Sequence, residues 1–254
     1  EGKVKQLVLV NCCDSARRVY DIVESTGKCK FLYMLDLPHE DNECEKVKYA
    51  QAIMRLKKAY EKFSGKTFDK EAFLNSFTEN ETEMKPYIGL MGVRVTGILE
   101  KMIRDNIQMD VDNLTCTGGR QLAVVPEQMR QMDEEKMFLA YADALLCQIP
   151  CFRMNNNTRR NQLYLDPNLK GIIYHTIKFC DYYGFEYASI KKNIKVPLLK
   201  IETDFTSQSA GQLLTRIQAF AETIEGSEDM DPGKGISEEA RKKMESGIYY
   251  VAGI

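Results

Sequence analysis

The sequence predicts an α/β fold made of two parallel-sheet subdomains joined by helices, the first one incomplete. Short apolar runs alternate with amphipathic stretches of helical periodicity, which is the pattern of βαβ units and hence of parallel strands. The chain has 254 residues, 44% of them apolar, enough for one large α/β domain or two ordinary ones. It begins with Glu1 rather than Met, so we expect an upstream part of the first subdomain.

Residues 1–42 are expected to form the end of the first subdomain. Its predicted elements are a strand, a helix and a second strand, at 5–10, 15–26 and 31–36. Asp14 or Ser15 is the expected N-cap of this helix, and Gly27 follows its end. Residues 43–84 are predicted to be connecting helices, at 43–64 and 69–77.

The second subdomain is predicted over residues 85–225, where strands and helices alternate again. Its expected strands lie at 87–95, 109–115, 171–179 and 196–202. Its expected helices lie at 97–106, 134–146, 157–164, 185–193 and 211–225. Residues 226–254 begin with a stretch rich in Gly, Pro, Ser and acids, so we expect a linker and the start of a further domain.

Charge and hydropathy exclude two classes of partner. The formal net charge is -2 and the pI is about 5.9, which gives no electrostatic basis for binding nucleic acid or an anionic membrane. No apolar run approaches the roughly 20 residues that span a bilayer, and no signal peptide is visible. We therefore expect a cytoplasmic protein.

Two expected strands end at cysteines. Cys12 and Cys13 follow the strand at 5–10, and Cys180 follows the apolar run at 171–179. The carboxyl ends of parallel strands are where open α/β sheets keep their chemistry, so these thiols predict a soft-metal site assembled from distant segments. For Cys12 or Cys13 taken singly, a buried structural thiol is an equally good interpretation.

The remaining cysteines leave more alternatives open. The chain has eight cysteines but neither paired CxxC motifs nor ferredoxin spacing, so any cluster needs ligands that the fold brings together. Cys147 and Cys151 can supply one or two of them, although packing explains them as well. Cys116 precedes the sequence Thr-Gly-Gly-Arg at 117–120, a loop that could approach a ligand's phosphate, and packing explains Cys116 equally well. His175 lies inside an apolar strand, which indicates a hydrogen-bonded core histidine.

Several segments together resemble the iron–sulfur subunits of the 2-hydroxyacyl-CoA dehydratase and benzoyl-CoA reductase family, including the 2-hydroxyglutaryl-CoA dehydratase D-component. They are KGIIYHTIKFCDYYGFEYASIKK, VPLLKIETDF and SAGQLLTRIQAF within 166–222, and NCCDSARRVYDI with FLYMLDLP near the start. The resemblance covers residues 5–225. It implies two Rossmann-like subdomains with a 4Fe–4S cluster between them, in which Cys13 and Cys180 match two cluster ligands and the third lies upstream of Glu1.

The resemblance also implies the reaction and the partners. An ATP-dependent activator with its own iron–sulfur cluster delivers one electron, and a CoA thioester is reduced to a ketyl that loses water, in the cytoplasm of an anaerobe. A homologous dehydratase subunit is a further expected partner, and the isolated fragment is expected to be inactive. The last residues, 249–254, resemble the first strand of the activator ATPase, which suggests a fusion.

Two other functions stay open from the sequence. One is a benzoyl-CoA-reductase-like or double-cubane enzyme, whose 8Fe–9S cluster uses paired cysteines such as Cys12 and Cys13, with Cys147 or Cys151 as extra ligands. The other belongs to a different class: a cluster-free α/β scaffold that binds a partner subunit and buries its cysteines.

Overall fold

The chain forms two units, each built from two separate segments. The computed structural model describes residues 5–77, 85–116, 118, 122, 126–148, 151–155, 158–178, 180–192, 194–204 and 210–225. Unit 1 comprises Glu1–Asn80 with Leu122–Asn156, and unit 2 comprises Glu81–Gln121 with Asn157–Ile254. The linker and further domain expected at 226–254 lie outside the described residues.

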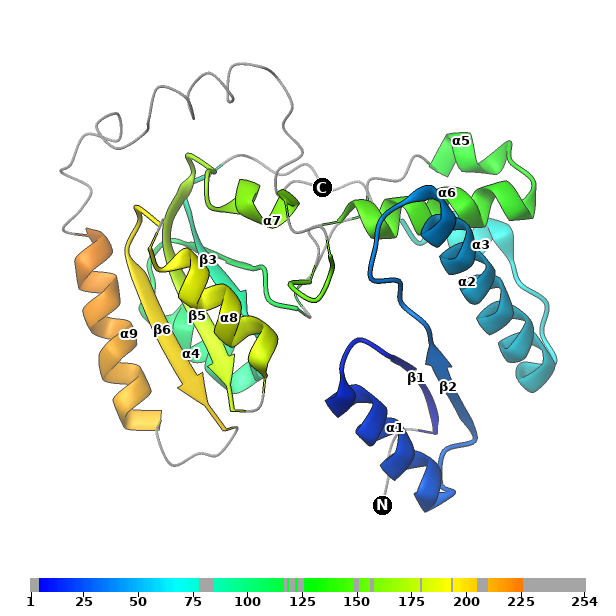
Figure 1. Ribbon diagram of the computed structural model, residues 1–254, viewed down its shortest axis with the longest axis horizontal. Helices are drawn as coiled ribbons and strands as arrows, with labels where there is room; N and C mark the ends of the chain where they lie inside the picture. The colour runs from blue at the N-terminus through cyan, green and yellow to red at the C-terminus, as the bar shows by residue number, and fades with distance from the viewer. Residues whose placement is uncertain are drawn as a thin grey trace. The chain divides into compact units, whose positions relative to one another are not determined.

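Unit 1 begins with the predicted βαβ arrangement. Its elements are β1 (Gln6–Val10), α1 (Asp14–Thr26), β2 (Phe31–Leu35), α2 (Glu43–Ser64), α3 (Lys70–Asn75), α5 (Pro126–Arg130) and α6 (Glu134–Cys147) (Figure 1). β1 and β2 are parallel and in register from Gln6↔Phe31 to Val10↔Leu35. Their carboxyl ends therefore lie at the same edge of this two-stranded sheet.

The helices of unit 1 pack around a core of their own. Asn42 starts α2 by accepting a hydrogen bond from the Glu45 amide at 3.0 Å, and Gly65, with a φ of 69°, ends it. The buried side chains of this core come from α2, α3, α5 and α6: Tyr49, Ala50, Ile53, Leu74, Met129, Met137, Phe138 and Ala142.

This core gives a different division of the chain from the one based on sequence. Residues 85–225 were expected in one subdomain, whereas 122–156 belong to unit 1. The reason is that the apolar face of α6, with Met137 and Phe138 almost fully buried, packs on α2. Helical periodicity shows that a face is apolar but not which element covers it. The helix α5 was not predicted, because five residues are too few for a periodic signal.

Unit 2 contains a four-stranded, wholly parallel sheet with strand order β4-β3-β5-β6. Its strands are β3 (Tyr87–Gly92), β4 (Asp110–Asn113), β5 (Leu169–Ile177) and β6 (Leu198–Thr203). Its helices are α4 (Gly97–Asn106), α7 (Thr158–Leu163), α8 (Asp181–Ile190) and α9 (Ala210–Glu225). The predicted α/β class with parallel sheets is thus confirmed.

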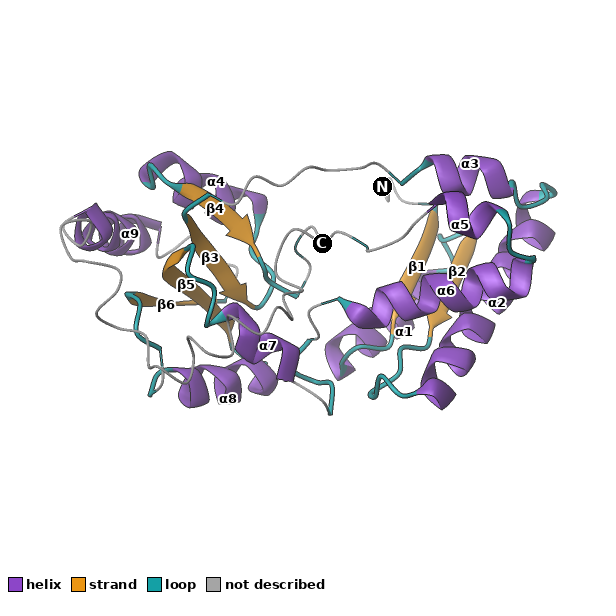
Figure 2. Cartoon of the chain, turned by 90° about the horizontal axis from the view of Figure 1, so that it is seen from above, coloured by secondary structure: helices purple, strands orange, loops and turns teal. Residues whose placement is uncertain are grey.

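Helices cover both faces of this sheet. On one face, side chains of α4 and α9 join the core around Ile88, Leu90 and Ile173. On the other face α8 packs on β5, where the rings of Tyr174 and Tyr187 lie 5.5 Å apart. Figure 2 shows α4 and α9 on the side of the sheet opposite to α8. Unit 2 is therefore doubly wound, as the alternation of strands and helices predicted.

Two element bounds differ from the sequence-based ones in a way that matters for the site. The helix α8 begins at Asp181 rather than at residue 185. Gly184 therefore lies inside the helix, where an added Cβ would contact nothing within 4 Å. The strand β3 ends at Gly92 rather than at residue 95, where the backbone turns with a φ of 92°. Among the helices of the described residues, none is long and apolar enough to cross a membrane.

Candidate functional site

The carboxyl edge of the β1–β2 sheet is held together by Asn11. The amide of Asn11 donates to the Leu35 carbonyl at 3.2 Å. Its side-chain Nδ2 donates to Asp36 Oδ1 at 2.7 Å, and its Oδ1 accepts from the Leu37 amide at 2.8 Å. These bonds join the chain after β1 to the chain after β2, and so they fix the segment that carries the paired cysteines.

Cys13 is the N-cap of α1, whereas Asp14 or Ser15 was expected from the sequence. Its backbone is extended, its carbonyl accepts from the Arg17 amide at 3.2 Å, and its thiol makes no capping hydrogen bond. The amides in the first turn of a helix and the positive end of its dipole favour an anionic group there. The half-buried side chain of Cys13 therefore lies at the amino-terminal end of α1.

Cys12 shares its surroundings with two other thiols and one cation. Burial raises the pKa of Cys12 to about 11, and the neighbouring Cys13 and Cys151 add to this rise. The positive charge of Arg153 lowers the same pKa and so opposes them. Cys12, Cys13, Cys151 and Arg153 thus form one site within unit 1, which we call the thiol site.

The segment 151–155 reaches the thiol site by binding the chain after β2. Arg153 Nη2 donates to the Pro38 carbonyl at 3.0 Å, and the Asn155 amide donates to the His39 carbonyl at 2.9 Å. A turn closed by the Met154 amide on the Cys151 carbonyl, at 2.9 Å, orients the segment. Cys147, by contrast, is exposed at the end of α6, where its Sγ lies 3.9 Å from Asp143 Oδ1.

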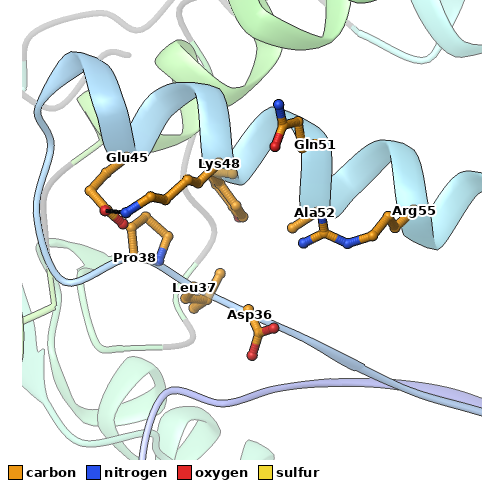
Figure 3. A pocket seen from close by; sticks show the side chains of 9 residues that line it. Asp36, Leu37, Pro38, Glu45, Lys48, Gln51, Ala52 and Arg55 are labelled. Atoms are coloured by element: carbon orange, nitrogen blue, oxygen red, sulfur yellow. Dashed lines mark hydrogen bonds and ion pairs between the residues drawn. The ribbon is translucent and has the colours of Figure 1, made fainter.

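A hollow of about 250 Å³ lies between α2 and the segment after β2. Figure 3 shows Glu45, Lys48 and Arg55 of α2 on one side and Asp36 and Pro38 on the other. Both signs of charge line it, and Lys48 pairs with Glu45 at 2.7 Å. Pro38, which lines the hollow, also accepts the hydrogen bond from Arg153, so the hollow adjoins the thiol site.

Unit 2 has cysteines at the equivalent edge of its own sheet. β4 and β5 lie on opposite sides of β3, so the strand order reverses there, and ligands of open α/β sheets bind at such a point. After β5, Cys180 is the N-cap of α8, and its amide donates to the Ile177 carbonyl at 3.2 Å. After β4, the amide of Cys116 donates to the Gly92 carbonyl at 3.1 Å, and its Sγ accepts from the Arg94 amide at 3.3 Å.

The expected ligand pair is divided between the two units. Cys13 belongs to unit 1 and Cys180 to unit 2, so their joint role stays a prediction. Within the described ranges, no three His, Cys, Asp or Glu side chains are grouped so as to hold a metal ion. The eight cysteines, all of them within the described part of the chain, form no disulfide with one another.

The residue types of the thiol site are nevertheless of interest. Thiolates are the ligands that iron–sulfur clusters use, and the pKa of Cys12 responds to Cys13, Cys151 and the buried guanidinium of Arg153. Nη1 of Arg153 is buried without a hydrogen-bond partner among the described residues. A buried N–H donor without an acceptor is typical of a site that binds an anion and is unusual in a closed protein core.

Sequence reasoning missed Asn11 and Arg153. A polar residue directly after a predicted strand is a signal for Asn11, but many such residues only face solvent. The Cys-x-Arg spacing of Cys151 and Arg153 carried no recognisable pattern. His175, on the other hand, is the hydrogen-bonded core histidine that was predicted: it is buried, and its ring nitrogens lie 2.9 Å from the Val93 carbonyl and 2.8 Å from Thr203 Oγ1.

A fold of two α/β units with thiols at the carboxyl edges of parallel sheets defines a class of cysteine-bearing α/β proteins. The model of the family described as 2-hydroxyglutaryl-CoA dehydratase, D-component, matches residues 2–85 and 79–224 of the chain. The chain belongs to this family, as the resemblance indicated.

Two curated relatives are similar over more than half of the chain. "Putative dehydratase subunit YjiM" of Escherichia coli (strain K12) is 27% identical over 180 residues, which are 62% of this chain and 45% of that protein. The "(R)-phenyllactyl-CoA dehydratase beta subunit" of Clostridium sporogenes is 27% identical over 157 residues, 56% of this chain and 40% of the relative. The matched part therefore spans less than half the length of either relative.

Proposed function

We propose that the chain is part of the iron–sulfur subunit of an ATP-dependent, radical-type 2-hydroxyacyl-CoA dehydratase. When bound, the 4Fe–4S cluster would supply one electron to a CoA thioester, giving a ketyl that loses water. Membership of the D-component family supports the dehydratase class. The single observation that supports the cluster is the thiol site, where Cys12, Cys13 and Cys151 lie with a buried cation.

The residues of this chain would bind and orient the cluster. Cys13 and Cys180 are the proposed principal ligands, and each is the N-cap of a helix, where free first-turn amides favour an anionic group. Cys12 and Cys151 are secondary candidates because they share the thiol site. Cys147 is the weakest candidate, since it lies exposed at the end of α6.

The partners follow from the same proposal. One relative is named as a beta subunit, which supports a second, homologous dehydratase subunit as a partner here. An ATP-dependent activator with its own iron–sulfur cluster would deliver the electron, and an acyl-CoA would be the substrate. We place the protein in the cytoplasm of an anaerobe, where a low-potential cluster is protected from oxygen.

The decisive experiment is anaerobic purification of the full-length protein with its partner subunit, followed by iron and sulfide analysis. The wild-type protein should contain iron and show thiolate-to-iron charge-transfer absorbance. Cys13→Ser and Cys180→Ser should each lose most of the iron, whereas Cys44→Ser, at an exposed position on α2, should keep it. A wild-type protein without iron would instead favour the cluster-free scaffold.

A second candidate function draws on the pairing of Cys12 with Cys13. These thiols are adjacent in the sequence, and both Cys13 and Cys151 raise the pKa of Cys12. Such a group of thiols within one unit favours a reductase with an 8Fe–9S double-cubane cluster. The iron analysis separates the two functions, because the double-cubane cluster contains twice as much iron for each subunit as a 4Fe–4S cluster does.

A further inference from the structure

The hollow between α2 and the segment after β2 has the composition of a small-molecule site. Its volume is about 250 Å³. Pockets for drug-sized ligands measure roughly 300–1,000 Å³, so this one fits a compact molecule. Leu37, Pro38 and Ala52 give it apolar walls, and Pro38 and Ala52 are themselves buried. Apolar walls with a few polar groups are what ligand pockets generally share.

The two acidic side chains of the hollow already have partners. Asp36 Oδ1 accepts from Asn11 Nδ2 at 2.7 Å, and in Figure 3 the carboxylate of Asp36 points away from α2. Glu45 pairs with Lys48 at 2.7 Å. The guanidinium of Arg55, by contrast, forms no ion pair with any residue that the structure describes. Arg55 therefore brings to the hollow a positive charge that neither acid compensates.

Tyr49 supplies a second donor without a partner. Its side chain is only 8% exposed and lines the hollow. Within the described ranges, its hydroxyl has no hydrogen-bond partner. Burial raises the pKa of Tyr49 to about 12, so the hydroxyl stays protonated at neutral pH and can donate. Since buried polar groups are normally hydrogen-bonded, this hydroxyl favours a ligand with acceptor oxygens.

The wall opposite α2 is backed by a further cation. The Pro38 carbonyl accepts from Nη2 of the buried Arg153 at 3.0 Å. Nη1 of Arg153 is buried without a hydrogen-bond partner in the described part of the chain. The hollow and its wall thus carry three positive charges against two negative ones, from Lys48, Arg55 and Arg153 and from Asp36 and Glu45. This excess favours an anionic ligand, because charges interact more strongly away from bulk water.

We propose that this hollow binds a small organic anion, whose carboxylate or phosphate group lies against Arg55 and Tyr49 and whose apolar part lies against the wall after β2. A guanidinium matches two oxygens of either oxyanion, and charge-assisted hydrogen bonds of this kind are the strong ones. The inference does not rest on the proposed function, because it needs neither a cluster nor the thiol site. All residues that line the hollow belong to unit 1.

The test is saturation-transfer NMR on the full-length protein, with phenyl phosphate and phenylacetate as probes. Each probe joins an oxyanion to a compact apolar ring, whereas inorganic phosphate and acetate, used as competitors, lack the ring. The wild-type protein should bind at least one of the two probes, and the corresponding inorganic phosphate or acetate should displace it only at about tenfold higher concentration, since it buries no ring. The tighter probe shows whether the site takes a phosphate or a carboxylate.

Three variants locate the binding. Arg55→Gln should weaken it about tenfold, through the loss of a charge-assisted hydrogen bond, and Tyr49→Phe about fivefold, through the loss of a neutral one. Lys58→Gln is the matched control, because it removes the same charge from an exposed side chain of α2 that does not line the hollow. Its affinity should equal that of the wild type.

Three outcomes would overturn the inference. The first is that neither probe binds the wild-type protein. The second is an unchanged affinity in Arg55→Gln, which would place the probe elsewhere. The third is an equal loss in Lys58→Gln, which would show general attraction to a positive surface. None of them bears on the iron content, which tests the proposed function separately.

Discussion

Arg160 and Glu186 form a two-point ion pair in the interior of unit 2, with N–O distances of 2.5 and 2.8 Å. Their side chains are 1% and 2% exposed. The hydroxyls of Tyr164 and Tyr174 donate to the same carboxylate at 2.7 and 2.5 Å. Burial and the charge of Glu186 raise the pKa of both phenols, so they remain protonated donors.

The pair attaches α8 to the rest of unit 2, because Glu186 lies in this helix. Cys180 is the N-cap of the same helix. Glu186→Gln leaves the buried guanidinium of Arg160 without its counter-charge, so we expect a loss of about 3–5 kcal/mol in the free energy of unfolding. Tyr164→Phe removes one of the four hydrogen bonds to this carboxylate described above and should cost about 1.5 kcal/mol. Urea unfolding of both variants measures the difference. Equal losses would show that the charge of the pair is not what stabilises unit 2.

Gly92 ends β3 in a conformation that only glycine adopts easily. Its φ is 92°, and a Cβ would lie 2.1 Å from the carbonyl oxygen of His175. Because that oxygen belongs to the backbone of β5, it cannot move aside without breaking the sheet. Gly92→Ala should therefore destabilise the protein by about 3 kcal/mol or more.

Gly97→Ala is the matched control for Gly92→Ala. Gly97 is the first residue of α4, and a Cβ there meets nothing within 4 Å. Alanine favours the helix, so we expect a stability between unchanged and about 1 kcal/mol higher. Thermal unfolding checks both variants. A similar loss in both would mean that the close approach to His175 does not limit substitution at Gly92.

The sequence predicted most elements but not how they associate. The positions of Cys13 after β1 and of Cys180 after β5 followed from apolar runs that stop abruptly, which is a local signal. The placement of α6 in unit 1 depends on the packing of its apolar face against α2, which the sequence pattern of α6 does not reveal. Arg153 was missed for the same reason, since its importance comes from contact with Pro38, 115 residues earlier in the chain.

His175 makes the stability of unit 2 depend on pH. The Val93 carbonyl only accepts, so Nδ1 carries the proton, and Nε2 of the neutral ring accepts from the Thr203 hydroxyl. Burial lowers the pKa of His175 below its ordinary value of 6.5. The unfolded chain therefore takes up the proton first as the pH falls, and folding stability decreases from pH 6.5 down to the folded-state pKa.

Comparison of the wild-type protein with His175→Gln isolates this effect. Unfolding by urea at several pH values between 8 and 5 should give parallel curves above pH 6.5. Below it, the wild-type protein should lose more stability than the variant, which has no titrating group at this position. Curves that stay parallel throughout would show that protonation of His175 does not oppose folding.

The bonds of Asn11 should control the reactivity of Cys12. Burial raises the pKa of Cys12 to about 11, so at pH 8 only about one thiol in a thousand is ionised, and alkylation is slow. Asn11→Ala removes the hydrogen bonds to Asp36 and Leu37 that hold the segment. Greater exposure would lower this pKa, and each unit of decrease raises the alkylation rate about tenfold.

Mass spectrometry of the iron-free full-length protein, treated with iodoacetamide for increasing times, measures that rate at Cys12 itself. Asn42→Ala is the control, because it removes the N-cap of α2 and costs about 1 kcal/mol without touching the segment after β1. We expect faster alkylation of Cys12 in Asn11→Ala and the wild-type rate in Asn42→Ala. If both variants are equally fast, general loosening of unit 1 exposes Cys12; if both match the wild type, the bonds of Asn11 do not keep it buried.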